Sequence, residues 1–455
     1  MEKELTGKKV AVIGLGVEGK DLVNFLLENK SDVTLFDQKP ESELDFNGIK
    51  KDRLELSCGS DYLKRGFSEF DVVFRSPGIY PNILEFVKAR KEGVIISSAM
   101  RLFFELCPAK IIGITGTKGK GTTSTLIYET LKKDKKDVYL AGNIGKPYLE
   151  LLPILNKDSW VVLELSSFQL MDLHISPHIA VVLNITVDHL DWHKNREEYI
   201  EAKSNIVRFQ SKNDFAVINS DYETPKSFEN FTKGKVYYFS RNKDLNGSFI
   251  RDKKIILNIY REEIIGDTKK LQLRGEHNWE NVTAAVCASF LAGAKIPSIK
   301  KSVFGFKGLE HRLELVRNYK GISFYNDSFS TNPQPTIAAI KSFPEQITLI
   351  LGGSDKGLNY DEMAREIVEN KNVKNIILIG QIAPIIKKSL TKAKFEGKIF
   401  DFGMLSMKEI VRKSFENAEK GGVVLLSPAS ASFGMFNDYK DRGNQFKNEI
   451  SNLRE

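Results

Sequence analysis

Cysteine is scarce in this chain of 455 residues, and long apolar runs are missing. Cys58, Cys107 and Cys287 lie far apart without a CxxC pair, which excludes a cysteine-built zinc or iron–sulfur site and is typical of a reducing compartment. The longest apolar runs, such as IAVVLNI, have seven residues or fewer, whereas a membrane-spanning helix needs about 20. The N-terminal residues also show no signal-peptide segment. We therefore expect a cytoplasmic protein without a membrane span.

Neither sign of charge dominates the chain. The 67 basic residues are interleaved with 59 acidic ones, which leaves a net charge of +8 and no long basic tail. A positive balance attracts anions. An anionic small-molecule substrate accounts for this charge without a nucleic-acid partner.

Short β-branched runs alternate with longer amphipathic stretches. This pattern is typical of βαβ units in a parallel sheet covered by helices. Three series of strands are expected, at 10–14, 33–37, 72–76 and 94–97, then at 111–116, 161–167 and 179–186, and finally at 322–327, 347–353, 375–380 and 423–430. We predict an α/β fold of three tandem domains, residues 1–97, 98–304 and 305–455. The composition of 235–275 predicts β-hairpins inserted in the middle domain.

The strongest local motif is GITGTKGKGTT at 113–123. A strand enters a Gly-rich turn and a helix leaves it, so backbone N–H groups and Lys120 would face a phosphate. The spacing departs from the standard Walker A motif, and Gly121 stands where a Ser or Thr usually holds Mg²⁺. Thr122 or Thr123 would have to take that role. A Gly-rich turn without a ligand is the alternative interpretation.

The GxGxxG motif GLGVEG (14–19) follows the first predicted strand, and Asp37 ends the next one. This pattern favours a nucleotide-like ligand, although a tight strand–helix turn without any ligand gives the same motif. SPGI (76–79) adds a second turn at the same sheet edge. NAD is not required by either motif.

Charged residues at the ends of the middle-domain strands suggest a Mg–ATP site. Glu164 lies near the end of a buried strand, where a carboxylate needs a cation, and His189 follows the next strand in NITVDHLDWH (184–193). A zinc site of His189 and His193 would need a third ligand. Lys203, taken alone, is expected to be a surface lysine.

Polar turns also follow the strands of the third series, in FYNDSFSTNP (324–333), LGGSDKG (351–357) and LLSPASASFGMF (425–436). Because α/β sheets bind ligands at the carboxyl ends of their strands, we expect Asp327 and Lys356 at one edge. Arg312 of HRLE (311–314) would approach from the linker. Each residue alone is more often a turn residue, but the recurrence favours a ligand site.

With these motifs in order, the chain resembles the Mur ligases of peptidoglycan synthesis over essentially its whole length. The segments that carry the resemblance are GLGVEGKD, SPGI, GITGTKGKGTT, GNIG (142–145), ELSSFQL, NITVDHLDWH, GEHNWENVTAA (275–285), HRLE, NDSFSTNP, GGSDKG and SPASASFGMFNDYKDRG (427–443). The resemblance implies a Rossmann-like UDP-binding domain, a P-loop ATPase domain and a Rossmann-like amino-acid-binding domain.

The resemblance further implies an ATP-dependent amide-bond ligase, most similar to the members that add D-glutamate to UDP-N-acetylmuramoyl-L-alanine. The carboxylate of that substrate would attack the γ-phosphate, and the amine of glutamate would displace phosphate from the acyl phosphate. Two Mg²⁺ ions and a monomer are also implied. From the charge pattern and the short apolar runs we expect no nucleic-acid and no membrane partner.

Site residues are carried over from the resemblance in four sets. The catalytic residues would be Lys120, Glu164, His189 and Lys203, with Lys203 carbamylated, and the metal ligands Thr122, Glu164, His189 and Lys203. ATP would be held by Gly116, Thr117, Lys118, Gly119, Lys120, Gly121, Thr122, Asn278, Arg312 and Asp327. The UDP substrate would be held by Val17, Glu18, Asp37, Gln38, Lys39, Ser76 and Asn143. Glutamate would be held by Thr331, Lys356 and Ser432.

Two departures from the family pattern leave alternatives open. Gly121 weakens the metal assignment at the P-loop, and Phe329 stands where the glutamate-adding members usually have a lysine, in DSKATN. An enzyme that adds L-glutamate or another amino acid is one alternative. A nucleotide-binding paralogue without catalysis is another. A folylpolyglutamate synthase would lack the first domain, and a dehydrogenase would leave the P-loop motif unexplained.

Overall fold

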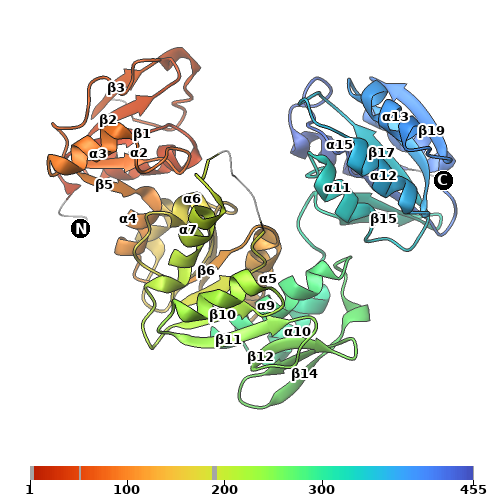
Figure 1. The fold of residues 1–455 in the computed structure, drawn as a ribbon, viewed down its shortest axis with the longest axis horizontal. Helices are drawn as coiled ribbons and strands as arrows, with labels where there is room; N and C mark the ends of the chain where they lie inside the picture. Colours follow the sequence, from red (N-terminus) through yellow and green to blue (C-terminus); the bar gives the residue numbers. More distant parts are fainter. Residues whose placement is uncertain (1–4, 51–52, 187–191, 454–455) are drawn as a thin grey trace. The chain divides into compact units, whose positions relative to one another are not determined.

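The β-branched runs form strands of three separate sheets in the computed structural model, which describes residues 5–50, 53–186 and 192–453 (Figure 1). The chain divides into two units, which we describe separately. The first comprises Met1–Lys269 and Trp279–Val303, and the second Lys270–Asn278 and Phe304–Glu455. None of the helices within the described ranges is long and apolar enough to cross a membrane.

The first sheet of the first unit has the strand order β3-β2-β1-β4-β5, and all its pairs are parallel. Its strands are β1 (Lys9–Ile13), β2 (Asp32–Asp37), β3 (Leu54–Cys58), β4 (Val72–Arg75) and β5 (Ile95–Ser98), and its helices are α2 (Val17–Glu28) and α3 (Leu84–Lys91). Strand β3 was not predicted. It lies at the edge and none of its residues is fully buried, so it lacks the apolar run of a central strand.

The second sheet has the order β14-β13-β12-β11-β10-β9-β6-β8-β7. Its strands are β6 (Lys110–Thr115), β7 (Val138–Gly142), β8 (Trp160–Glu164), β9 (Ile179–Val182), β10 (Phe215–Asn219), β11 (Lys235–Ser240), β12 (Gly247–Arg251), β13 (Lys254–Asn258) and β14 (Glu262–Asp267). The prediction of inserted hairpins was partly wrong. Strand β11 pairs in parallel with β10 and β12 and so extends the sheet, and only the β12–β13 and β13–β14 pairs are antiparallel.

Helices flank this second sheet in the first unit. They are α5 (Lys120–Lys133), α6 (Ser167–Leu170), α7 (Arg196–Arg208), α8 (Glu223–Lys226), α9 (His277–Leu291) and α10 (Ile296–Gly305). The first two residues of α9 belong to the second unit. Helix α5 carries candidate site residues shortly after the carboxyl end of β6, where α/β sheets bind ligands, and α7 carries Lys203.

The third sheet forms the second unit, with the order β15-β16-β20-β17-β18-β19. Its strands are β15 (Glu314–Tyr319), β16 (Ile322–Asn326), β17 (Ile347–Gly352), β18 (Val373–Ile379), β19 (Lys398–Gly403) and β20 (Val423–Leu426). Only β15 runs antiparallel to its neighbour. The helices α11 (Pro333–Ile340), α12 (Asp361–Glu369), α13 (Ala383–Lys392), α14 (Met407–Asn417) and α15 (Tyr439–Ser451) complete the unit. The predicted α/β class with mostly parallel sheets is confirmed.

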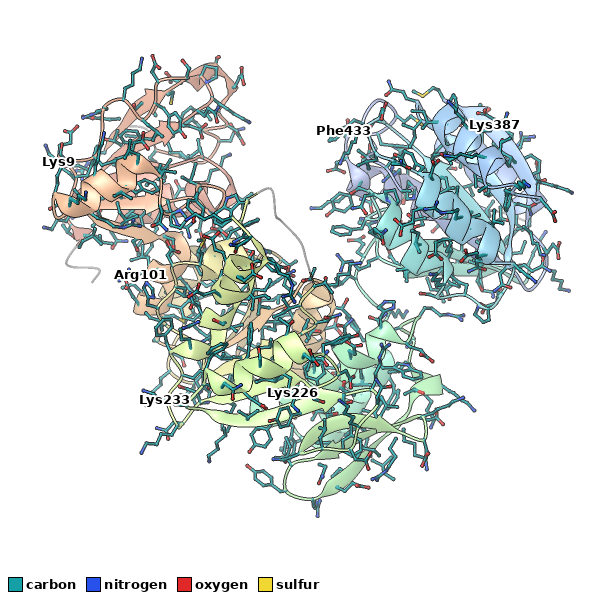
Figure 2. The ribbon with its side chains drawn as sticks, viewed as in Figure 1. Lys9, Arg101, Lys226, Lys233, Lys387 and Phe433 are labelled. Carbon is teal, nitrogen blue, oxygen red and sulfur yellow. The ribbon has the colours of Figure 1, made fainter. Side chains whose placement is uncertain are left out.

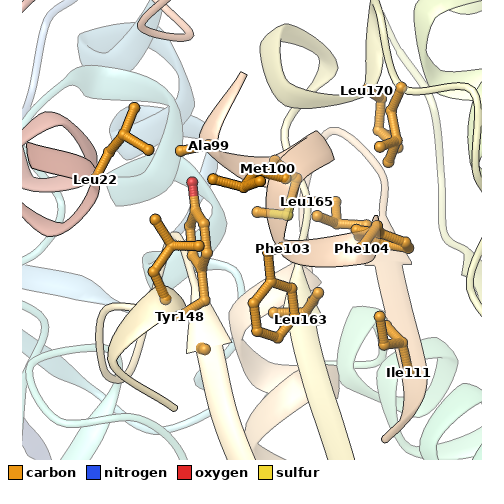
Figure 3. Packing of buried hydrophobic residues seen from close by; sticks show 14 of the residues in the cluster. Leu22, Ala99, Met100, Phe103, Phe104, Ile111, Tyr148, Leu163, Leu165 and Leu170 are labelled. Atoms are coloured by element: carbon orange, nitrogen blue, oxygen red, sulfur yellow. The ribbon is translucent and has the colours of Figure 1, made fainter. Parts of the chain in front are cut away.

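Helix α4 (Ala99–Leu106) occupies the segment that joins the first two sheets. The hydroxyl of Ser98 caps it by accepting a hydrogen bond from the N–H of Arg101, which is labelled in Figure 2. Figure 3 shows Met100 and Phe103 of α4 packed among residues from both sides, including Leu22 of α2 and Leu163 of β8. One hydrophobic core therefore continues across the two sheets of the first unit, and its burial holds them together.

Candidate active site

The P-loop at 113–123 connects β6 to α5. Gly119 caps the helix at φ +86, a left-handed conformation that glycine adopts without strain. The Nζ of Lys120 donates hydrogen bonds to the carbonyl oxygens of Gly116 (3.0 Å) and Thr117 (3.1 Å). The lysine therefore lies across the loop, beside the N-terminal end of α5, where free backbone N–H groups favour an anion.

The loop is tied to α7 and to the segment after β9 by contacts that the motif alone did not indicate. The Thr117 hydroxyl lies 3.0 Å from the hydroxyl of Tyr199 and accepts a hydrogen bond from the Thr186 N–H at 3.0 Å. The Thr117 N–H donates to the carbonyl of Asn184 at 2.8 Å. These bonds fix the loop on its β9 side.

Glu164 is the last residue of β8, which pairs in parallel with β6 and β7. Its register partners are Ile114, at the start of the P-loop, and Gly142. Glu164 is 8% exposed. The Asn143 N–H donates to its backbone carbonyl at 3.2 Å. Glu164 thus lies at the carboxyl edge of the second sheet, the edge from which the P-loop leaves β6. Asn143 lies at the same edge, directly after β7.

Lys203 is buried, at 2% exposure, so the expectation from the residues alone of a surface lysine was wrong. Helix α7 brings it to the P-loop. Its Nζ donates to the Gly116 carbonyl at 3.1 Å and to the Thr115 hydroxyl at 3.3 Å, and lies 4.8 Å from the centre of the Tyr199 ring. A buried lysine needs such partners because desolvation of the ammonium is costly.

The structure describes three of the four predicted metal ligands, Thr122, Glu164 and Lys203, because His189 lies outside the described residues. Thr122 is buried on the first turn of α5. The hydroxyl of Thr123 donates to Asn281 Oδ1 at 3.4 Å, which favours Thr122 as the residue that replaces the missing hydroxyl at Gly121. Over the described ranges, no three His, Cys, Asp or Glu side chains cluster as metal ligands. Mg²⁺ fits the site because it commonly binds one or two carboxylates together with phosphates and water.

The predicted UDP-binding turns come together at the carboxyl edge of the first sheet. Asp37 Oδ2 accepts a hydrogen bond from the Leu15 N–H at 2.8 Å, and its Oδ1 accepts one from the Lys39 N–H at 2.9 Å. Ser76 donates its hydroxyl to the Ile13 carbonyl at 2.5 Å. A Cβ at Gly19 would lie 2.0 Å from the Gly14 oxygen, which explains the last glycine of the motif. Val17, Gln38 and Lys39 are exposed at this edge.

Glu18 connects this edge to the second sheet. Its carboxylate accepts a hydrogen bond from the Gln169 side-chain amide, and Gln169 Oε1 accepts from the Ser166 N–H at 2.9 Å. Burial raises the pKa of Glu18, and the Gln169 bond partly opposes this shift. The GLGVEG motif did not indicate this contact, because Gln169 lies in the distant ELSSFQL segment.

In the second unit, Asp327 follows β16 and is 2% exposed. Its Oδ2 accepts hydrogen bonds from the hydroxyls of Ser330 (2.5 Å) and Ser427 (2.7 Å), and its Oδ1 accepts one from the Leu313 N–H (3.1 Å). Burial raises the pKa of Asp327 to about 6, against these hydrogen bonds. The carboxylate therefore joins the turns after β16 and β20 to the HRLE turn.

The remaining candidates of the second unit lie on the same turns or on the linker. Lys356 is exposed on the loop after β17, Thr331 is half-buried and Ser432 is buried after β20. Ser354 and Ala431 form a bridge that joins the loops after β17 and β20. Asn278 donates its side-chain amide to the Arg274 carbonyl at 2.6 Å. The second unit thus gathers its predicted residues at the carboxyl edge of its sheet and on the linker.

Comparison with known proteins gives matches along the whole chain. The family models described as "Mur ligase MurD-like, N-terminal domain", "Mur ligase middle domain" and "Mur ligase, glutamate ligase domain" match residues 8–98, 114–289 and 311–430. Two crystal structures show the same fold. UDP-N-acetylmuramate-alanine ligase MurC from Thermotoga maritima has a TM-score of 0.59 at 17% identity and covers 98% of this chain and 99% of its own. MurF ligase from Thermotoga maritima, in complex with ADP, has a TM-score of 0.55 at 19% identity and covers 99% and 97%.

Closer relatives are found by sequence. The UDP-N-acetylmuramoylalanine–D-glutamate ligase of Ruminiclostridium cellulolyticum is 41% identical over 463 residues, which cover 100% of this chain and 98% of that protein. Ligases of the same name from Acetivibrio thermocellus and Clostridium tetani are each 40% identical and cover 99% of this chain and 98% of their own. Because this identity extends over the full length, together with the three family models, the chain belongs to the Mur ligase family.

Proposed function

We propose that this ATP-dependent amide-bond ligase joins D-glutamate to UDP-N-acetylmuramoyl-L-alanine. The observation that carries the proposal is the identity of about 40% with D-glutamate ligases over nearly the whole of both chains. The arrangement of Lys120, Glu164 and Lys203 at one strand edge supports it. This edge offers what phosphoryl transfer requires, namely cations and backbone donors for the phosphates and oxygen ligands for a metal.

The proposed reaction has two steps. The terminal carboxylate of the UDP substrate attacks the γ-phosphorus of ATP, which forms an acyl phosphate and releases ADP. The neutral amine of glutamate then attacks the acyl carbon, which forms the amide and releases phosphate and a proton. Lys120 and the N–H groups of 116–122 neutralise the phosphates and hold them in line.

Mg²⁺ would be held by Glu164 and Thr122, together with His189 and Lys203 if the family pattern applies, and it would neutralise phosphate charge. In the structure Lys203 donates two hydrogen bonds. A carbamate at its Nζ keeps a single N–H, so carbamylation would release one of these bonds and supply an anionic oxygen ligand.

The remaining assignments are part of the proposal. Residues 1–97 bind the UDP moiety through Val17, Glu18, Asp37, Gln38, Lys39 and Ser76, with Asn143 on the muramoyl side. Residues 98–304 bind ATP, and residues 305–455 bind glutamate through Thr331, Lys356 and Ser432. The nucleotide is also contacted by Asn278, Arg312 and Asp327. We further propose that the protein is cytoplasmic and that it is a monomer. Size-exclusion chromatography with light scattering would test the oligomeric state.

The experiment that tests this function is phosphate release with ATP, Mg²⁺ and UDP-N-acetylmuramoyl-L-alanine, with one amino acid added at a time. Turnover with D-glutamate, and none when the UDP substrate is left out, is the expected result. Mass spectrometry of the product must show the mass of one added glutamate residue. Turnover with another amino acid but not with D-glutamate would overturn the substrate assignment.

The second candidate is a ligase that adds L-glutamate, favoured by one observation. Phe329 replaces the lysine that the family pattern places near the amino-acid substrate, so a pocket for two carboxylates has one cation fewer. The same assay with L-glutamate decides between the two, because the enantiomers differ only in how their carboxylates and amine can be held.

A further inference from the structure

Arg312 lies on a turn whose backbone is constrained on both sides. His311 and Leu313 have positive φ angles of 62° and 45°, a conformation that residues with a side chain adopt rarely. The turn is held by the Leu313 N–H, which donates to Asp327 Oδ1 at 3.1 Å, and by the His311 carbonyl, which accepts from the Phe329 N–H at 3.0 Å. A strained turn of this kind persists only where contacts with the surrounding structure hold it in place, and such turns cluster at functional sites.

The side chain of Arg312 lies over the ring of Phe329 and also acts electrostatically on Asp327. The guanidinium carbon lies 4.4 Å from the ring centre, within the range of a cation–π contact. The ring of Phe329 in turn meets Tyr439 of α15 edge to face, with centroids 5.1 Å apart and an interplanar angle of 90°. Phe329 is 43% exposed, so packing of a core does not account for its place.

A lysine at position 329, as in the family pattern, would place a second cation beside Arg312. Like charges repel, and a lysine offers no flat face for the guanidinium. Phe329 instead creates a surface on which the arginine is ordered. An arginine ordered in advance loses less side-chain entropy when it meets an anion.

We propose that Phe329 is a positioning residue for Arg312 and acts on the nucleotide rather than on the amino acid. This inference rests on the proposed role of Arg312 as a contact of ATP. Phe329 orders the guanidinium over its ring and the constrained turn fixes the backbone, so that a bound nucleotide would meet a cation that is already oriented. A phenylalanine in place of lysine thus changes the affinity for the nucleotide and does not change the affinity for glutamate.

The test is the dissociation constant for ADP, measured by titration calorimetry on the full chain without UDP substrate or amino acid. Phe329→Leu, which removes the aromatic face, should weaken ADP binding by about threefold to tenfold. Phe329→Tyr, which keeps the ring, should stay within about twofold of the parent protein. The KM for the amino acid should be unchanged in both variants, whereas the KM for ATP should rise in Phe329→Leu.

Phe231→Leu is the matched control. Phe231 belongs to the first unit, lies outside every candidate site and is 40% exposed. The guanidinium carbon of Arg208 lies 5.0 Å from the centre of its ring. It should leave ADP binding unchanged. A second comparison uses Arg312→Gln, in which Phe329→Leu should have no further effect if the ring acts through the arginine.

Two results would overturn the proposal. One is a Phe329→Leu variant that raises the KM for the amino acid while ADP binds as before. The other is an effect of Phe329→Leu on ADP binding that is undiminished in the Arg312→Gln background. Melting curves check that each variant folds. If the parent protein binds no ADP at all, the proposed ATP site itself fails, which is a different outcome from either of these.

Discussion

The Nζ of Lys203 donates a hydrogen bond to the backbone carbonyl of Gly116 at 3.1 Å, although the two residues lie 87 positions apart in the chain. This bond joins helix α7 to the turn between β6 and α5. The carbonyl of Gly116 also accepts a bond from Lys120 at 3.0 Å. Two lysine side chains therefore meet at one peptide group of the P-loop, and their positive charge would favour the phosphate and the carbamate proposed for this place.

Replacing Lys203 by methionine should lower kcat by at least about 100-fold, because a buried ionic group beside the proposed phosphate site is lost. The exposed Lys212→Met, on the loop after α7, should stay within about twofold. Steady-state phosphate release measures both. Carbamylation predicts in addition that the parent enzyme loses activity when CO₂ is removed and regains it with bicarbonate. Full activity in CO₂-free buffer would exclude a functional carbamate.

Gly119→Ala should weaken nucleotide binding by more than about tenfold and destabilise the fold by about 1–3 kcal/mol. The reason is twofold, since the residue has φ +86 and its new Cβ would lie 2.2 Å from Asn281 Oδ1. Gly66→Ala separates the two effects, because Gly66 has φ +72 with no atom within 4 Å of the new Cβ. It should cost some stability and leave ADP binding intact. Equal ADP affinity in both variants would contradict the proposed P-loop geometry.

Asp172→Ala should destabilise the first unit by about 3–5 kcal/mol. Asp172 pairs with the buried Arg75 through two bonds of 2.6 Å, and its loss leaves a guanidinium buried without its anion. The exposed pair of Lys8 and Asp71 provides the comparison, since Lys8→Ala should cost about 0–1 kcal/mol. The midpoint of thermal unfolding reports both. A small effect of Asp172→Ala would mean that the carbonyl partners of Arg75 suffice to hold it.

Asp21 should make the stability of the first unit dependent on pH. Burial raises its pKa from 3.8 to about 6, against the hydrogen bond from the Leu149 N–H at 2.9 Å. Since the folded state holds this proton more tightly than the unfolded state, the native protein loses stability as pH rises from about 4 to about 6. The shift corresponds to about 3 kcal/mol, an upper value.

The variant Asp21→Asn tests this, because asparagine keeps an oxygen for Leu149 and cannot ionise. Its stability relative to the parent protein should rise between pH 4 and pH 7 and stay constant above, as measured by urea unfolding. Asp158→Asn, an exposed loop residue, is the control. A stability difference for Asp21→Asn that does not change with pH would show that Asp21 is accommodated in its charged form.

The sequence predicted most of the central strands, but it missed the central strand β10 and the edge strands β3, β7, β15 and β19. The runs at 10–14, 111–116 and 347–353 are apolar because both faces of a central parallel strand are buried, and β1, β6 and β17 lie there. Strand β3 has no fully buried residue and left no such run. Strand β11 was assigned to a hairpin because its partner β10 was not predicted as a strand and local composition cannot reveal a parallel pair.

The sequence by itself determined the α/β class, the P-loop with its glycines and Lys120, and the positions of Glu164 at the end of one buried strand and Asp327 after another. These features depend on residues within one or two turns of each other, so local chemistry is enough. Only the tertiary structure decided that Lys203 is buried against Gly116, that Glu18 binds Gln169, and that Phe329 carries Arg312. Such contacts join side chains from different elements, and their formation depends on how the sheets and helices pack rather than on any local pattern.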